Sequence, residues 1–126
     1  MILTDETVEN NPILRARNRE ECRSWLADNC QTEKVVWLIV YHKTSKAPSV
    51  HWHDAIENTL CYGWVDSKAK KRGTDNCYLK FTPRNPKSTW GKRSKERALK
   101  MIALGLMTSN GQKVIDTARE NGKWDA

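Results

Sequence analysis

The stretch CYGWVDSKAKKRGTDNCYLKFTPRNPKSTW, residues 61–90, decides the fold, because it contains a helix end, two strands and a rigid loop. Gly63 follows an apolar helical pattern over residues 52–62 and is expected to end that helix in a left-handed conformation. Residues 67–72 and 77–83 flank the turn-forming segment GTDN, which predicts a β-hairpin. Two prolines then exclude a continued strand, so residues 83–87 are expected to form a rigid loop.

The alternation along the predicted hairpin separates an inner face from an outer face. Cys77, Leu79 and Phe81 share one side and are expected to meet the core together with Ala69. The outer face is cationic with one aromatic ring, and its members are Lys68, Lys70, Arg72, Tyr78 and Lys80. Such a face can bind a nucleic-acid backbone, because cations displace counterions while an aromatic ring stacks on a base. Lysines on a hairpin also prevent edge-to-edge aggregation, and this alternative stays open.

The rest of the chain supplies one further strand and the helices. The run VVWLIVY, residues 35–41, is short, continuous and β-branched, which indicates a strand buried on both faces at the centre of the sheet. Helical patterns cover residues 18–29, 52–62 and 95–104 and the segment after Thr108. The sequence therefore predicts an α+β domain with a small, mostly antiparallel sheet, one central strand plus a β-hairpin, covered by about four helices.

Several details of the helices and of the chain ends follow from local chemistry. Asn18 is expected to cap the first helix, with Glu21 three residues later. In the helix over 95–104, Leu99, Ile102 and Ala103 are expected to point inward. Residues 1–17 are expected to be a partly ordered leader, residues 18–126 a single domain, and Trp124 a C-terminal anchor.

The positive charge of the chain is concentrated in one region. The formal net charge is +7, whereas residues 67–100 alone contain twelve lysines and arginines and only two acidic residues. A local field of this kind attracts anionic partners such as phosphates, nucleic acid or lipid headgroups, although it also serves solubility.

Cysteine spacing and the N-terminus limit the classes of protein that fit. The four cysteines contain no CxxC pair, which argues against a zinc knuckle or a redox dithiol and favours reduced thiols. The N-terminus has neither a cationic start nor an apolar run of signal-peptide length, and no segment approaches the length of a membrane span. We therefore expect a cytoplasmic location.

Four strings of residues together resemble a known family. They are LCYGWVDS, YLKFTPRNPKSTW, MIALGLMTSNG and GKWDA, and they are similar to the YdeI/OmpD-associated, or bacteriocin-protection, family over about residues 18–126. The resemblance implies a bacterial α+β domain, with a family name that links some members to protection against bacteriocins or antimicrobial peptides and to an outer-membrane porin. The signature positions carried over to this chain are Gly63, Trp64, Asp66, Thr82, Pro83, Arg84, Ser88 and Trp90. Family members often have a serine and an asparagine where this chain has Gly91 and Ser94, so its ligand or affinity is expected to differ.

One constellation within residues 61–90 is the candidate ligand site. Its members are Trp64, Asp66, Lys68, Arg84, Ser88 and Trp90. Arg84 offers a planar fork for a carboxylate or phosphate, the amides at Ser88 could receive an anion, and the indoles could stack on a flat ligand. The alternative is structural: Asp66 and Arg84 form an ion pair while both tryptophans fill the core.

Enzymatic and metal-dependent functions receive less support. An enzyme would use Asp66 as acid or base on a substrate held by Arg84 and Ser88, but no catalytic motif identifies a reaction. His51 and His53 lie near Asp54 and Glu57, yet a third ligand at a convincing spacing is missing, so we predict no metal and no cofactor. The sequence thus predicts a non-enzymatic binding domain for an unknown anionic ligand or protein partner, with enzyme activity and nucleic-acid binding as alternatives.

Overall fold

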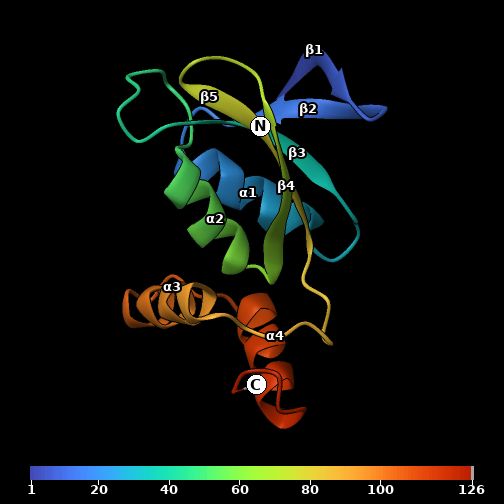
Figure 1. Cartoon of the computed structure of the whole chain (residues 1–126), viewed down its shortest axis with the longest axis vertical. Helices are drawn as coiled ribbons and strands as arrows, with labels where there is room; N and C mark the ends of the chain where they lie inside the picture. Colours follow the sequence, from blue (N-terminus) through green and yellow to red (C-terminus); the bar gives the residue numbers. More distant parts are fainter. Residues whose placement is uncertain (126) are drawn as a thin grey trace.

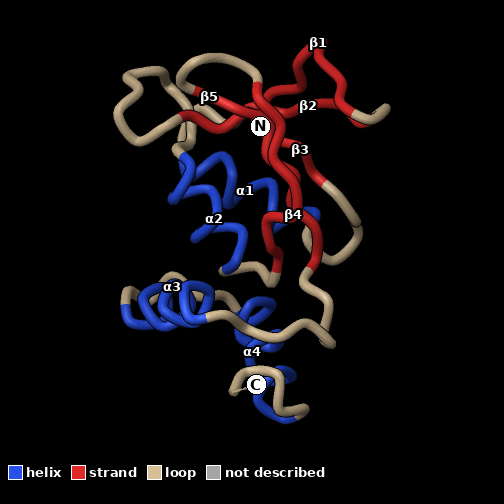
Figure 2. Tube along the Cα trace, in the orientation of Figure 1, coloured by secondary structure: helices blue, strands red, loops and turns tan. Residues whose placement is uncertain are grey.

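The computed structural model describes residues 1–125 and shows an α+β fold built on one sheet (Figure 1). The described elements, in chain order, are β1 (Ile2–Val8), β2 (Asn11–Arg15), α1 (Arg19–Asn29), β3 (Val36–Tyr41), α2 (Trp52–Leu60), β4 (Trp64–Lys71), β5 (Asn76–Pro83), α3 (Lys92–Ala103) and α4 (Ser109–Glu120). The strands lie together in one part of the molecule with α1 and α2 against them, while α3 and α4 lie beyond one end (Figure 2).

The predicted sheet was wrong in its size and in its strand directions. Across residues 1–125 the sheet has five strands in the order β1-β2-β3-β5-β4. Strands β2 and β3 run parallel, with Ile13 opposite Trp37, while the other three pairs are antiparallel. The sheet is therefore mixed, and the central strand β3 lies between the N-terminal strand β2 and the predicted hairpin strand β5.

Residues 1–17, predicted from the sequence to be a partly ordered leader, contain the two missing strands. β1 and β2 pair antiparallel and turn at Glu9 and Asn10, which both have positive φ angles. Acidic and asparagine residues are disfavoured in strands, so this segment gives no strand pattern in the sequence. Its place in the sheet depends on the parallel contact with β3 and on side chains from β4 and β5.

The two faces of the sheet are buried in different ways. Val36, Leu38 and Val40 point to the face covered by α1 and α2, where they join Leu79 and Phe81. Trp37 and Ile39 point to the opposite face and pack with Val8 and Ile13 of the N-terminal strands in a second, smaller cluster. The central strand is thus buried on both sides, as its continuous apolar run predicts.

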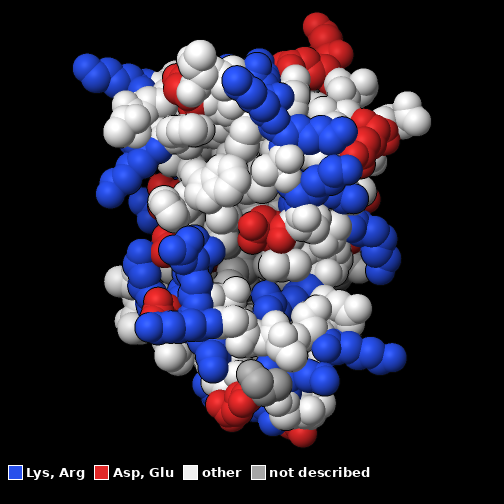
Figure 3. Space-filling view, in the orientation of Figure 1, with Lys and Arg blue, Asp and Glu red and all other residues white. Residues whose placement is uncertain are grey.

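Acidic residues of the N-terminal hairpin reach the cationic side chains of the β4–β5 hairpin. Glu6 accepts hydrogen bonds from Arg72 Nε and Nη2, at 3.0 and 2.9 Å, and from the hydroxyl of Tyr78. Glu9 forms ion pairs with Lys68 and with Lys70, at 2.5 and 3.2 Å. Red and blue side chains accordingly lie side by side in the upper right of the molecule (Figure 3). Since β1 and β4 are opposite edges of the sheet, these contacts require a strongly coiled sheet.

The end of α2 meets the start of α4 at very close range. The carbonyl oxygen of Cys61 accepts hydrogen bonds from the backbone N–H of Thr108, at 3.2 Å, and from its hydroxyl. A Cβ on Gly111 would lie 2.3 Å from that same oxygen, and a Cβ on Gly63 would lie 2.8 Å from Val114 Cγ2. Gly63 also has a φ of 83°, which confirms the predicted left-handed helix end. Both positions therefore require glycine.

Most helix predictions are confirmed, but the orientation of α3 was wrong. Asn18 caps α1 by accepting from the N–H of Glu21 at 2.9 Å, and Trp124 is buried as an anchor. In α3 the buried residues are Ala98 and Met101, whereas Leu99 and Ile102 are exposed. Each helix within residues 1–125 is too short or too polar to cross a bilayer.

The Glu6 contacts predict an acid-dependent part of the stability. The hydrogen bonds from Arg72 and then Tyr78 hold the pKa of Glu6 below its usual range. Because the folded-state pKa is depressed, this stabilisation is present above the unfolded pKa, near 4.5, and is lost as pH falls through the folded value. Glu6→Gln is expected to lower the unfolding free energy at pH 7 and to flatten its decline below pH 4.5. Urea unfolding from pH 7 to pH 2.5 measures both effects.

Glu33→Gln is the matched control for Glu6→Gln, because Glu33 is exposed and forms no ion pair among residues 1–125. The unfolding free energy of Glu33→Gln should fall with pH in the same way as that of the parent protein. If the unfolding free energies of the parent and Glu6→Gln proteins fell equally below pH 4.5, the assigned role of Glu6 would be contradicted.

The close contact between α2 and α4 predicts that a methyl group added at Gly63 or Gly111 lowers the stability of the fold, whereas one added at Gly91 does not. Gly63→Ala and Gly111→Ala should each destabilise the fold by about 1–3 kcal/mol, through backbone strain at Gly63 and overpacking at both positions. A Cβ on Gly91 would have no neighbouring atom within 4 Å among the described residues. Gly91→Ala should therefore change stability by less than about 1 kcal/mol, the usual scale of a cap substitution. Thermal and urea unfolding of the three variants tests this ranking.

Candidate functional site

Trp64 is a core residue, although the sequence placed it among the predicted ligand contacts. It is 1% exposed and packs edge-to-face on Trp25, with ring centroids 6.0 Å apart. Its Nε1 donates a hydrogen bond to the carbonyl of Cys30 at 3.2 Å. The indole is therefore fully occupied by protein contacts and is not available to stack on a ligand.

Arg84 and Trp90 are brought together by the proline loop. The guanidinium of Arg84 lies over the Trp90 ring, 3.8 Å from its centroid, and its Nη2 donates to the carbonyl of Thr89 at 3.1 Å. The backbone N–H of Arg84 donates to the carbonyl of Gly63 at 2.9 Å, which ties the loop to the end of α2. This arrangement fixes the direction of the guanidinium.

The Nε atom of Arg84 is buried and has no hydrogen-bond partner in the described part of the chain. Burial lowers the pKa of the guanidinium, and the negative charge of Asp66 opposes this shift without reversing it. Within residues 1–125 Asp66 and Arg84 form no ion pair closer than 4.0 Å. The predicted structural ion pair is therefore not found, and the half-buried positive charge of Arg84 lacks a counter-ion within 4.0 Å in the described residues.

A stack of two indoles and two arginines continues from Arg84 to the C-terminal segment. Trp90 packs on Trp124, with centroids 5.1 Å apart, and Arg119 lies over Trp124 at 4.9 Å. The backbone N–H of Trp90 donates to the carbonyl of Lys123 at 3.0 Å. Trp90 is 4% exposed, so it is a platform beneath Arg84 rather than an open stacking surface.

A hollow of about 170 Å³ adjoins Arg84, between the proline loop and α4. Its other lining residues are Pro86, Lys113, Val114 and Thr117. Lys113 was not predicted from the sequence. The apolar spacing of α4 shows which face of the helix is buried, but it does not show that the proline loop packs beside Lys113. The hollow combines two cations with an apolar wall, and none of its lining residues within 1–125 is acidic.

Ser88 and Lys68 do not join this arrangement. Ser88 is exposed, its N–H donates to the carbonyl of Asn85 at 3.0 Å, and α3 begins later, after Gly91. The predicted free helix-start amides at Ser88 are therefore not found. Lys68 lies on β4 and is paired with Glu9.

Two acidic residues of the N-terminal hairpin pair with three of the four cations on the proposed nucleic-acid face. Lys68 and Lys70 pair with Glu9, while Arg72 and Tyr78 bind Glu6. Lys80 lies 6.0 Å from the ring centroid of Trp37. The sequence could not reveal this pairing, because the acidic and cationic partners are separated by 59 to 72 positions along the chain.

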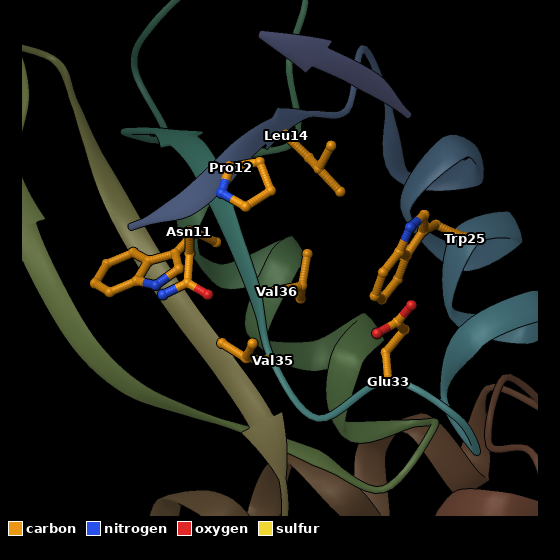
Figure 4. Close-up of a pocket in the computed structure, with 8 residues that line it drawn as sticks. Asn11, Pro12, Leu14, Trp25, Glu33, Val35 and Val36 are labelled. Atoms are coloured by element: carbon orange, nitrogen blue, oxygen red, sulfur yellow. The ribbon is translucent and has the colours of Figure 1, made fainter. Parts of the chain in front are cut away.

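A second hollow of about 320 Å³ lies where β2 and β3 diverge, beside α1 (Figure 4). Its lining residues are Asn11, Pro12, Leu14, Trp25, Glu33, Val35, Val36 and Trp37. Trp25 and Glu33 lie close together on one side, opposite Pro12 and Leu14 of β2. Trp37 Nε1 is buried and has no hydrogen-bond partner in the described residues.

Two further hollows of about 420 and 340 Å³ share Lys43 and His53 near the start of α2. His51 Nε2 lies 3.1 Å from the carbonyl oxygen of Ser45 and donates to it in the tautomer that carries the proton on Nε2, and Glu57 pairs with Lys100 at 2.7 Å. The described residues contain no group of three or more histidine, cysteine or acidic side chains arranged to hold a metal ion. The region thus offers polar and cationic contacts rather than a metal centre.

Comparison with known proteins shows the family of the chain. The chain belongs to the family described as a domain of unknown function (DUF8412), whose model matches residues 14–114. The matched range includes Arg84, Trp90 and Lys113. No curated protein and no solved structure matches the chain. The resemblance to the YdeI/OmpD-associated family stays a prediction.

Proposed function

We propose that this member of the DUF8412 family is a binding domain for a small anion, a carboxylate or phosphate that carries a short apolar group, in the hollow beside Arg84. The observation that carries this proposal is the half-buried guanidinium of Arg84, which forms no ion pair within 4.0 Å in the described residues. A partly desolvated charge without a counter-ion is unfavourable, and an anion bound beside it would reduce that penalty.

The fixed position of Arg84 supports anion binding in particular. Its guanidinium is held by stacking on Trp90 and by the hydrogen bond to Thr89. A planar guanidinium offers parallel N–H donors that match the two oxygens of a carboxylate or phosphate. Because the side chain is already ordered, binding loses little rotamer entropy.

The remaining lining residues favour an amphipathic ligand. Lys113 adds a second cation, while Pro86, Val114 and Thr117 supply apolar contact. A hollow of about 170 Å³ is smaller than most sites for drug-sized molecules. It suits a small acid or the anionic end of a longer molecule.

The two alternative functions have less support from the geometry. Asp66 does not line the hollow, so it is not placed to act as acid or base on an anion bound by Arg84. Three of the four hairpin cations that would bind nucleic acid, Lys68, Lys70 and Arg72, are paired with Glu6 or Glu9. We therefore propose binding without turnover.

Titration with simple anions tests the proposal. We expect butyrate, acetate and inorganic phosphate to shift the backbone and side-chain NMR signals of Arg84, Lys113 and Val114, with butyrate binding more tightly than acetate. Arg84→Lys keeps the charge but removes the fork, and should weaken binding about tenfold, the scale of one lost charge-assisted hydrogen bond. Lys113→Gln should weaken binding severalfold, because it removes an exposed cation.

Lys87→Gln is the matched control, since Lys87 is exposed on the same loop and does not line the hollow. It should leave the affinity for butyrate nearly unchanged. Shifts that are absent from Arg84 and Lys113, or that persist unchanged in Arg84→Lys, would overturn the proposal.

A further inference from the structure

Helix α3 has an outward apolar surface that the binding of a small anion does not explain. The residues buried beneath α3 are Ala98 and Met101. Leu99 and Ile102 lie outside this buried stripe and are 51% and 38% exposed, and Leu104, directly after the helix, is 60% exposed. We call Leu99, Ile102 and Leu104 the apolar tip of α3. Large exposed side chains gathered at one helix end indicate a contact surface.

Cations surround the apolar tip. Helix α3 has the sequence KRSKERALKMIA, with five lysines and arginines and one acidic residue. Lys100 pairs with Glu57, and Arg97 lies 3.4 Å from His53, so these two face the body of the protein. Lys92, Arg93 and Lys95 form no ion pair within residues 1–125. Blue side chains accordingly gather over α3, with few red ones among them (Figure 3).

The helical spacing places lysines and apolar residues on one outer face. Lys92 and Lys95 precede Leu99 by seven and four positions, so they share its side of the helix. This outer face is cationic in the first turn and apolar in the last turn. A lysine stem can lie along an apolar surface while its ammonium group reaches a polar layer.

We propose that α3 and its apolar tip bind the surface of an anionic lipid bilayer, with the helix lying in the interface. A basic amphipathic helix of this kind lies flat at the boundary between headgroups and acyl chains. Helix α3 lies at an end of the molecule remote from β1 and β2, so a flat approach is open to it (Figures 1 and 2).

Two other occupants fit the surface less well. A second copy of the chain would bring its own Lys92, Arg93 and Lys95 against the same three cations, and like charges repel. An acidic protein would need a groove or pocket for specific docking, but the apolar tip lines none of the four hollows described above. A bilayer supplies negative charge and an apolar layer without requiring a complementary shape.

Flotation of the full chain with vesicles tests the proposal. Vesicles of phosphatidylcholine with 30% phosphatidylglycerol should float the protein at low salt, and vesicles of phosphatidylcholine alone should bind it at least tenfold more weakly. Binding should fall steeply between 50 and 300 mM salt, because screening weakens the attraction to the headgroups. Leu99→Ser with Leu104→Ser should lower the partition coefficient at least tenfold at unchanged charge, since apolar insertion is lost.

Charge variants separate the role of α3 from general cationic attraction. Lys92→Gln with Lys95→Gln should lower partitioning about tenfold or more. Lys34→Gln with Lys46→Gln removes the same charge from exposed lysines outside α3 and should have a small effect. Lys113→Gln should bind vesicles as the parent does, so failure of the anion site and failure of this surface are distinguishable. Circular dichroism should show an unchanged fold for all variants.

Three results would overturn the proposal. The first is equal partitioning of parent and Leu99→Ser, Leu104→Ser proteins, which would indicate non-specific charge attraction. The second is equal loss in the two paired lysine variants. The third is absence of vesicle binding together with tight, α3-dependent binding to an acidic polypeptide such as polyglutamate, which would assign the surface to a protein partner.

Discussion

The head-to-tail contact between α2 and α4 is the constraint on which the candidate site depends. The Cys61 carbonyl at the end of α2 is satisfied by Thr108 at the start of α4, so a helix end with partial negative charge meets one with partial positive charge. The backbones can approach this closely only because Gly63 and Gly111 lack side chains. Gly63 then directs β4, and its carbonyl holds the N–H of Arg84. One contact between backbones thereby fixes the distance between the proline loop and α4, and hence the hollow between them.

Local chemistry in the sequence was sufficient for about half of the fold. The continuous apolar run of β3, the Asn18 cap and the positive φ of Gly63 depend on neighbouring residues, and these predictions are confirmed. The two N-terminal strands depend on a parallel partner more than twenty residues away and on cations farther along the chain, so no local pattern shows them. In α3 the larger apolar residues Leu99 and Ile102 suggested the inner face, but the buried residues are the smaller Ala98 and Met101, and Ala98 packs with Leu60, Trp90 and the residues of α4.

The sequence predicted the types of side chain at the candidate site, but it did not predict which residues line the hollow. The sequence identified Arg84 and Trp90 as a cation and an aromatic ring on a rigid loop, and the structure places them in contact. It could not show that Trp64 faces the core, because an indole that packs on Trp25 has the same sequence signature as one that stacks on a ligand. Nor could it show that Lys113 of α4 lines the same hollow, since that depends on how helices pack against the loop.

The N-terminal hairpin limits how strongly the positive charge in residues 67–100 can attract external anions. Glu6 and Glu9 are part of the same chain as the lysines and arginines that they bind, so they act as tethered competitors of any external anion. A tethered group has an effective concentration on the order of millimolar. A free polyanion must exceed that effective concentration, or bind more tightly than a carboxylate, before it displaces them. Within the fold, Glu6 and Glu9 thereby reduce the access of dilute anions to Lys68, Lys70 and Arg72 of the β4–β5 hairpin.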